Sequence, residues 1–270
     1  MTDADFCYDT QMSLLVSVAL FAFGTIVASF VGVLAGRLYT GQSFLTGRSL
    51  CDACAKPLSA WSLVPIFSYL FSAGRARCCG AHLSLLSPLS ELSLGVLFFL
   101  AYLKVGFSSV LLFLLLSLSL LLALVLYDLA HQILPSPLLM VFIAASAVTG
   151  FMTTSSPSAF FSSVSAAFLI AASLALIHFA SRGRAMGLAD APFVFGCALL
   201  TGSAALPGFI FSFWIGAVVG IAVLARRPRG SRMGVEVPFA PYLAAGFLLA
   251  YFTQWNPFIF TTALFLPFFQ

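Results

Sequence analysis

Long apolar segments with almost no charge follow one another along this 270-residue chain, and they constrain its fold more than any other feature. A helix needs about 20 consecutive apolar residues to cross the hydrocarbon core of a bilayer. Hydrophobic residues make up 61% of the chain and charged residues only 7%. Soluble domains carry about 25% charged residues, so a water-facing surface cannot be built from this composition. We therefore expect an all-α, polytopic membrane protein whose solvent is the lipid bilayer.

The apolar segments predict about eight transmembrane helices. Their expected positions are 12–36, 84–103, 108–127, 137–153, 158–180, 190–206, 208–225 and 238–254. The chain then divides into a first transmembrane helix (1–36), a small cysteine-containing insert (37–83), a helical transmembrane core (84–254) and an apolar tail (255–270).

Basic residues indicate the orientation of these helices. Arg37 to Arg77 lie between the first and second predicted spans, and Arg182 and Arg184 lie between the fifth and sixth. By parity these connections share one side of the membrane, and only Lys104 lies on the other side. Because basic loops stay in the cytoplasm, we expect the insert to be cytoplasmic and the N-terminus to be outside. No basic run is interleaved with aromatic residues, so we expect no nucleic-acid partner.

Two aspartates at the borders of predicted spans are the strongest candidates for chemistry. Asp128 closes the third span and Asp190 opens the sixth, which places both at cytoplasmic helix ends. Carboxylates in or beside spans are costly and usually functional. A close pair of carboxylates shares one proton, so one acts as a base while the other polarises a carbonyl group. The simpler alternative is an aspartate in the headgroup region, with Asp190 serving as a helix cap.

Four of the six cysteines fall within residues 51–79, where they suggest a metal-binding segment. One Cys-x-x-Cys pair is followed by two adjacent cysteines, an arrangement similar to a zinc ribbon with a broken second half. Ala76 stands where the first cysteine of that second half would fall, so the fourth ligand is either Cys78 or His82. Free thiols of a degenerate site are the alternative. The predicted structural zinc ligands are Cys51, Cys54, Cys78 and Cys79.

The order and spacing of these motifs resemble the type IV prepilin peptidases, and the resemblance runs along most of the chain. Asp128, before Leu134-Pro135, matches the first catalytic aspartate of that family, and Gly187-Leu-Ala-Asp190 matches its Gly-x-Gly-Asp element. The other similar segments are Gly47 to Cys54, Trp61 to Leu70, Pro88 to Leu92 and Val237 to Leu243.

The resemblance implies an intramembrane aspartyl peptidase of the GxGD type in the bacterial inner membrane. It would remove the leader from type IV prepilin or pseudopilin precursors at the cytoplasmic face, with Asp128 and Asp190 as catalytic residues and 84–254 as the peptidase core. Many members also methylate the new N-terminus with S-adenosylmethionine. The sequence itself carries no glycine-rich cofactor fingerprint for that second step.

The chain departs from the family pattern beside the second aspartate. Ala189 replaces the second glycine, and a backbone with positive φ would be strained there. Ala191-Pro192 follows the aspartate where the family has a lysine. Both aspartates are retained, so we expect an active enzyme. The alternatives are a catalytically silent scaffold or assembly partner of a pilus or type II secretion system, and a small transporter, whose site would lie nearer the membrane midplane.

Overall fold

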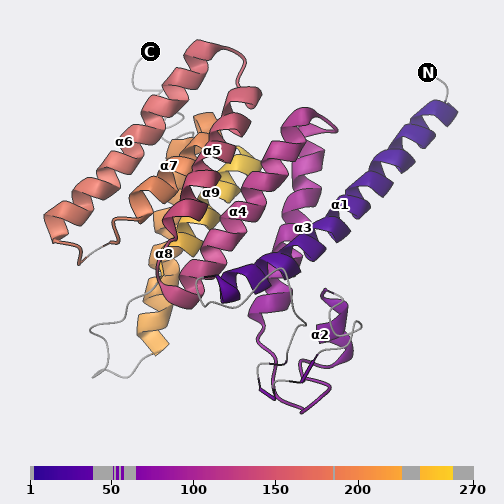
Figure 1. Cartoon of the computed structure of the whole chain (residues 1–270). Helices are drawn as coiled ribbons and strands as arrows, with labels where there is room; N and C mark the ends of the chain where they lie inside the picture. Colours follow the sequence, from indigo (N-terminus) through magenta and orange to yellow (C-terminus); the bar gives the residue numbers. More distant parts are fainter. Residues whose placement is uncertain are drawn as a thin grey trace. The chain divides into compact units, whose positions relative to one another are not determined.

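The computed structural model is almost entirely helical (Figure 1). It describes residues 3–38, 51, 53–54, 56–57, 65–184, 186–226 and 238–257. No β-strand occurs in these ranges, and Arg75 and His82 form an isolated β-bridge. The all-α prediction is therefore confirmed. The tail beyond 257 and the motif segments 47–50, 61–64 and 237 lie outside the described residues.

The chain forms two compact units, Met1–Ala130 and His131–Gln270. The first unit contains α1 (Asp3–Arg37), α2 (Phe67–Phe71), α3 (Leu86–Val105) and α4 (Ser109–His131). The second contains α5 (Ser136–Thr153), α6 (Pro157–Ser181), α7 (Asp190–Thr201), the 3-10 helix η2 (Gly202–Ala204), α8 (Ala205–Arg226) and α9 (Ala240–Thr253).

All eight predicted segments are helical, but in the described ranges six helices are long and apolar enough to cross a membrane. The sixth and seventh segments are joined, because α7, η2 and α8 form one continuous helical stretch, Asp190–Arg226. Gly202 ends α7 with a φ of 62°, a conformation that glycine adopts readily, and a single 3-10 turn leads into α8. The last segment, α9, has 14 residues and is shorter than a full span.

In the first unit, α1 packs closely against α3 through small side chains. The buried positions of α1 recur at helical spacing and include Ser17, Gly24 and Ala28. A Cβ at Gly24 would lie 2.8 Å from the carbonyl oxygen of Leu94, and one at Gly95 would lie 2.9 Å from Thr25 Cγ2. Such close approach of backbones is how helices gain packing energy in lipid, where no hydrophobic force drives them together.

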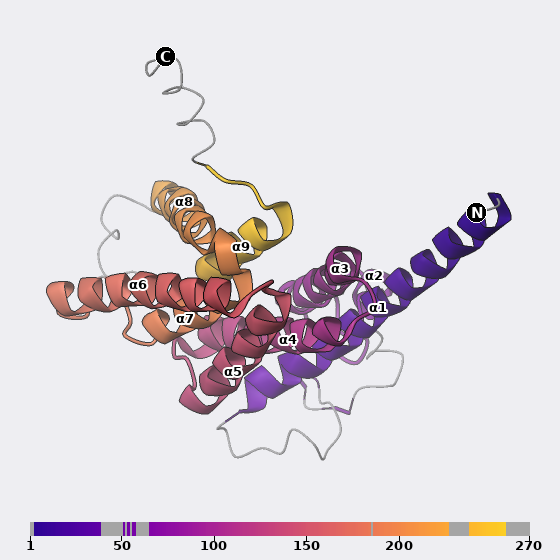
Figure 2. The same ribbon diagram turned by 90° about the horizontal axis from the view of Figure 1, so that it is seen from above.

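In the second unit, α7 is surrounded by α5, α6, α8 and α9 (Figure 1, Figure 2). Ten of its 12 residues are buried. At a rise of about 1.5 Å per residue, a helix of this length covers roughly 18 Å, well short of a bilayer core. A helix that is apolar on every side suits this enclosed position. Asp190 therefore lies at the start of the most enclosed helix of its unit.

The tightest helix contact in this unit joins α8 to α9. A Cβ at Gly246 would lie 2.2 Å from the backbone nitrogen of Ser212, and one at Gly208 would lie 3.0 Å from Phe247 Cα. The Ser212 hydroxyl donates hydrogen bonds to the carbonyl oxygens of Gly208, at 2.8 Å, and Leu243, at 3.0 Å. A hydroxyl thus links the two helices where both backbones come closest.

We expect Gly246→Val to force α8 and α9 apart, because its side chain would overlap the backbone of Ser212. Overpacking of this kind costs roughly 1–3 kcal/mol. Gly220→Val on α8 is the matched control, since nothing lies within 4 Å of a Cβ at Gly220. Thermal unfolding in detergent should show a lower midpoint for Gly246→Val only. Equal midpoints for the two variants would contradict the close α8–α9 contact.

Candidate functional site

Asp128 lies in the last turn of α4, which continues past it to His131. The buried face of this helix includes Leu114, Leu121 and Leu124, and Asp128 continues the same face with 6% of its surface exposed. The helical spacing of these residues, at intervals of seven, three and four, keeps the carboxylate off the lipid-exposed side. Asp128 is thus an acidic group at the end of an apolar helix that is shielded by protein.

Asp190 is the first residue of α7 and is 8% exposed. Its Oδ2 accepts a hydrogen bond from the backbone N–H of Gly187 at 3.2 Å, and its own N–H donates to the Gly187 carbonyl at 3.3 Å. A carboxylate at a helix N-terminus is stabilised by the helix dipole. These two bonds orient the side chain with respect to the loop that precedes it.

The backbone at Ala189 is not strained, although a Cβ at this position would be unfavourable if φ were positive. Its φ is −68° and its ψ is −18°, which is ordinary right-handed helical backbone. Pro192 lies in the first turn of α7, where backbone N–H groups have no intrahelical partner, so its missing N–H removes no helix bond. The departures Ala189 and Pro192 are therefore compatible with the observed backbone around Asp190.

The loop between α6 and α7 is held by His178, a residue of the last turn of α6. Arg182 adopts the left-handed conformation, and the Gly183 N–H donates to the His178 carbonyl at 2.8 Å, which closes the end of α6. The ring Nδ1 of His178 lies 2.8 Å from the Met186 carbonyl oxygen. A carbonyl only accepts hydrogen bonds, so Nδ1 carries the proton. His178 thus fixes the residue before Gly187, which in turn binds Asp190.

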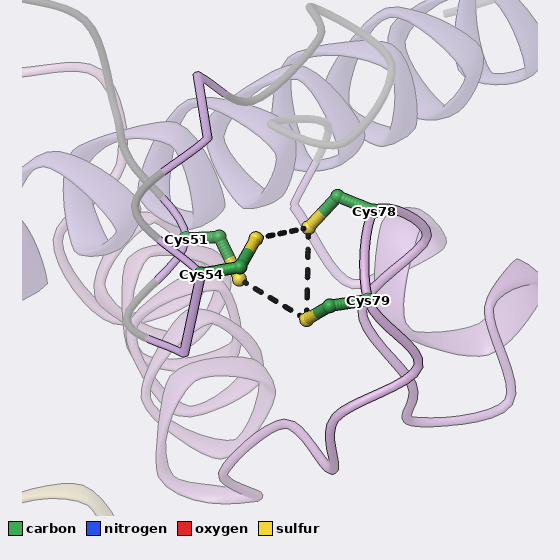
Figure 3. A group of neighbouring side chains, drawn as sticks. All are labelled: Cys51, Cys54, Cys78 and Cys79. Atoms are coloured by element: carbon green, nitrogen blue, oxygen red, sulfur yellow. Dashed lines mark hydrogen bonds between the residues drawn. The ribbon is translucent and has the colours of Figure 1, made fainter.

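In the first unit, the four predicted metal ligands come together (Figure 3). The Sγ atoms are 3.3 Å apart for Cys54 and Cys78, 3.8 Å for Cys51 and Cys79, and 3.9 Å for Cys78 and Cys79. All four sulfur atoms lie within 4.8 Å of one another. Tetrahedral zinc with Zn–S bonds of about 2.3 Å requires sulfur atoms about 3.8 Å apart. The cluster can therefore hold a metal ion.

A tight turn brings the adjacent cysteines to the cluster. The Ala76 N–H donates to the Ala81 carbonyl at 2.8 Å, and the Gly80 N–H donates to the Ala76 carbonyl at 2.7 Å. Gly80, with a φ of 73°, allows the chain to reverse. The turn presents both sulfur atoms to the same side, and His82, whose backbone forms the β-bridge with Arg75, is not among the groups gathered in the cluster. The geometry favours Cys78 over His82 as the fourth ligand.

The surroundings of the thiols shift their acidity in opposite directions. Hydrogen bonds from the backbone of Ala53 and Cys54 lower the pKa of Cys51 to about 7. Contacts with the sulfur atoms of Cys54 and Cys51 raise the pKa of Cys78 to about 12. Metals bind the thiolate form, so an ion that enters this cluster must displace the proton that Cys78 otherwise keeps.

Comparisons with known proteins match two families in succession along the chain. Residues 22–105 match the Bacterial Peptidase A24 N-terminal domain, and residues 115–222 match the Type IV leader peptidase family. The first match contains α3 and the cysteine cluster, and the second contains both Asp128 and Asp190.

Curated relatives carry one shared name, Prepilin leader peptidase/N-methyltransferase. The protein from Bacillus subtilis (strain 168) is 32% identical over 235 residues, which cover 86% of this chain and 92% of that protein. The protein from Legionella pneumophila is 29% identical over 208 residues, or 76% and 72% of the two chains. The protein from Myxococcus xanthus (strain DK1622) is 38% identical over 121 residues, which are 45% of this chain and 36% of that protein. No solved structure gives a significant match.

We expect His178→Ala to loosen the α6–α7 loop, because it removes the donor to the Met186 carbonyl. His178→Asn is the matched control, since its side-chain amide places a donor near the position of Nδ1. Hydrogen exchange of the backbone amides at 186–190 should be faster in His178→Ala and close to wild type in His178→Asn. Unchanged exchange in both variants would show that His178 does not hold the loop.

Proposed function

Because the chain belongs to the type IV leader peptidase family, we propose that it removes the leader peptides of type IV prepilin or pseudopilin precursors as an intramembrane aspartic peptidase. The observation that carries this proposal is a pair of buried carboxylates, Asp128 and Asp190, each at the end of an apolar helix. Both lie in the region that matches the family. Buried acidic groups at such positions are rare without a functional reason.

The order of the helices supports a shared membrane face for the two carboxylates. Two spans, α5 and α6, separate the end of α4 from the start of α7. Two crossings return the chain to the side from which it left. Two further spans, α3 and α4, separate the insert (37–83) from the end of α4, so the insert lies at the same face. Neither count depends on whether α7 and α8 cross the membrane once or twice. The basic residues of the insert favour the cytoplasm for this face and the outside for the N-terminus of a protein in the bacterial inner membrane.

In the proposed mechanism, the two carboxylates share one proton and titrate as a pair. The ionised member takes a proton from a water molecule, which attacks the scissile carbonyl carbon. The protonated member donates a hydrogen bond to the carbonyl oxygen, whose charge develops as the tetrahedral intermediate forms. The intermediate then breaks at its C–N bond, and the leaving amine takes up a proton. The loop contacts of Asp190 with Gly187 hold one carboxylate in place for these transfers.

The names of the relatives also include N-methyltransferase, and we propose the same second step here. S-adenosylmethionine would supply a methyl group to the new N-terminal amine of the cleaved precursor. The chain offers no glycine-rich fingerprint for this cofactor, so the proposal assigns it no residues.

For the cysteine cluster, we propose a structural zinc bound by four thiolates. A segment of this size buries too little apolar surface to be stable alone, and a metal supplies the missing free energy of folding. With four sulfur ligands the ion has no open position for water, which is the arrangement of structural rather than catalytic zinc.

We expect Asp128→Asn and Asp190→Asn each to reduce leader removal by at least about 100-fold, because an amide neither accepts nor supplies the catalytic proton. Co-expression with a prepilin precursor, followed by mass measurement of the product, reports leader loss and any added methyl group together. Asp9→Asn is the control, a carboxylate outside the proposed pair. Wild-type processing by either Asn variant, inserted at the normal level, would favour a catalytically silent scaffold.

We expect the purified protein to contain about one zinc ion per chain, measured by elemental analysis in the absence of chelators. Cys79→Ser should lower this content strongly, because it removes one of four ligands. Cys197→Ala is the matched control, since Cys197 is buried in α7 outside the cluster. A zinc-free wild-type protein, or full zinc content in Cys79→Ser, would indicate that the four thiols are not a zinc site.

A further inference from the structure

The short helix α2 exposes a continuous apolar surface that the proposed peptidase chemistry does not use. Phe67, Leu70 and Phe71 are 59%, 66% and 77% exposed, and the two phenylalanine rings stack at 6.4 Å. No charged residue lies between Lys56 and Arg75 in the sequence, so α2 and the residues that flank it carry no charge. Large apolar side chains gathered in this way mark a contact surface rather than a water-facing one.

A strained turn fixes the start of α2 against α3. Ile66 has a φ of 61° and a ψ of −52°, and the Phe67 N–H reaches back to the Pro65 carbonyl at 2.5 Å. This conformation is unfavourable for a β-branched residue and persists only where the surroundings impose it. The Ile66 N–H donates to Glu91 Oε2 at 2.7 Å. Glu91 is 6% exposed, and its Oε1 also accepts from the Ser87 hydroxyl at 3.4 Å.

The position of Glu91 sets the depth of α2. Glu91 lies five residues after Leu86, the first residue of α3, and α3 is long and apolar enough to span the bilayer. Five residues of helix correspond to about 7.5 Å, so α2 begins beside the first turns of a membrane span. The neighbouring side chains at this end of α3 are also exposed and apolar, at Leu83, Leu85, Leu86 and Leu89.

We propose that α2 lies in the boundary between lipid headgroups and acyl chains and anchors the cysteine-containing insert to the membrane, with Glu91 holding the anchor at that depth. The Ile66–Glu91 hydrogen bond ties the exposed apolar side chains of α2 to the start of a helix long enough to span the bilayer, where exposed leucines also lie, and this makes the bilayer its partner. A short helix with aromatic side chains suits this boundary. The anchor limits how far the four thiols can move from the membrane surface, and it does not depend on the identity of the catalytic residues.

Photo-crosslinking of the full chain in proteoliposomes of phosphatidylethanolamine and phosphatidylglycerol tests the anchor. A benzophenone amino acid replaces Phe71 in one protein and Arg77 in a second. Arg77 is exposed in the same insert and serves as the matched position. After irradiation, mass spectrometry should detect lipid adducts at position 71 at least several-fold more often than at position 77. Equal yields at the two positions, or adducts at 71 only with a prepilin or a second copy of this chain, would overturn the proposal.

Two substitutions test the role of Glu91 in the same assay. Glu91→Ala removes the acceptor for the Ile66 N–H, whereas Glu91→Gln keeps a carbonyl oxygen that accepts the same bond. The lipid adduct yield at position 71 should fall several-fold in Glu91→Ala and stay near wild type in Glu91→Gln. An unchanged yield in Glu91→Ala would show that α2 reaches the lipid without this tether. Because the readout is the adduct and not leader removal, a failure here leaves the proposed peptidase activity untouched, and an inactive aspartate pair leaves the anchor untouched.

Discussion

A peptide group inside a bilayer finds a hydrogen-bond partner only within the protein, and the rest of this structure depends on that constraint. It explains why the apolar segments are helices, since a helix satisfies its own backbone. It also explains where glycine is used. Helices in lipid adhere by close packing, so α1 meets α3 at Gly24 and Gly95, and α8 meets α9 at Gly246. Ser212 adds a hydroxyl at the second crossing and satisfies it on the carbonyls of both helices.

The same constraint governs the acidic groups, because a carboxylate in an apolar environment must be shielded and bonded. Asp128 continues the buried face of α4, and Asp190 starts the helix that its neighbours enclose most completely. Asp190 gains the N–H of Gly187, and His178 holds the adjoining carbonyl of Met186. Glu91 satisfies the N–H of Ile66 in a turn that would otherwise be unfavourable. Asp190 and Glu91 each accept a hydrogen bond from a backbone N–H of a neighbouring loop.

Much of this architecture could be predicted from the sequence, because hydropathy and length determine which segments enter lipid. The eight apolar segments predicted from the sequence are all helical, and the four cysteines predicted as metal ligands lie together. The continuity of α7 with α8 could not be predicted. The short helix α7 is stabilised by packing against the helices around it, and hydropathy alone does not report such packing. The roles of His178 and Glu91 were also missed. Their partners are backbone atoms 8 and 25 positions away, and no side-chain pattern records such contacts. Cys78 and Cys79 join the same cluster because the chain reverses at Gly80. The spacing of the cysteines in the sequence does not predict this reversal.

Ala189 stands at the position of the second glycine of the Gly-x-Gly-Asp motif, and its backbone shows what that position requires. The backbone at this position is right-handed, so any L-amino acid could adopt it without penalty. A glycine there would serve local crowding or mobility rather than handedness. Alanine in its place lowers the conformational entropy of the unfolded chain, because alanine has fewer accessible conformations than glycine. The alanine consequently favours the folded loop that presents Asp190, because less conformational freedom is lost when this segment folds.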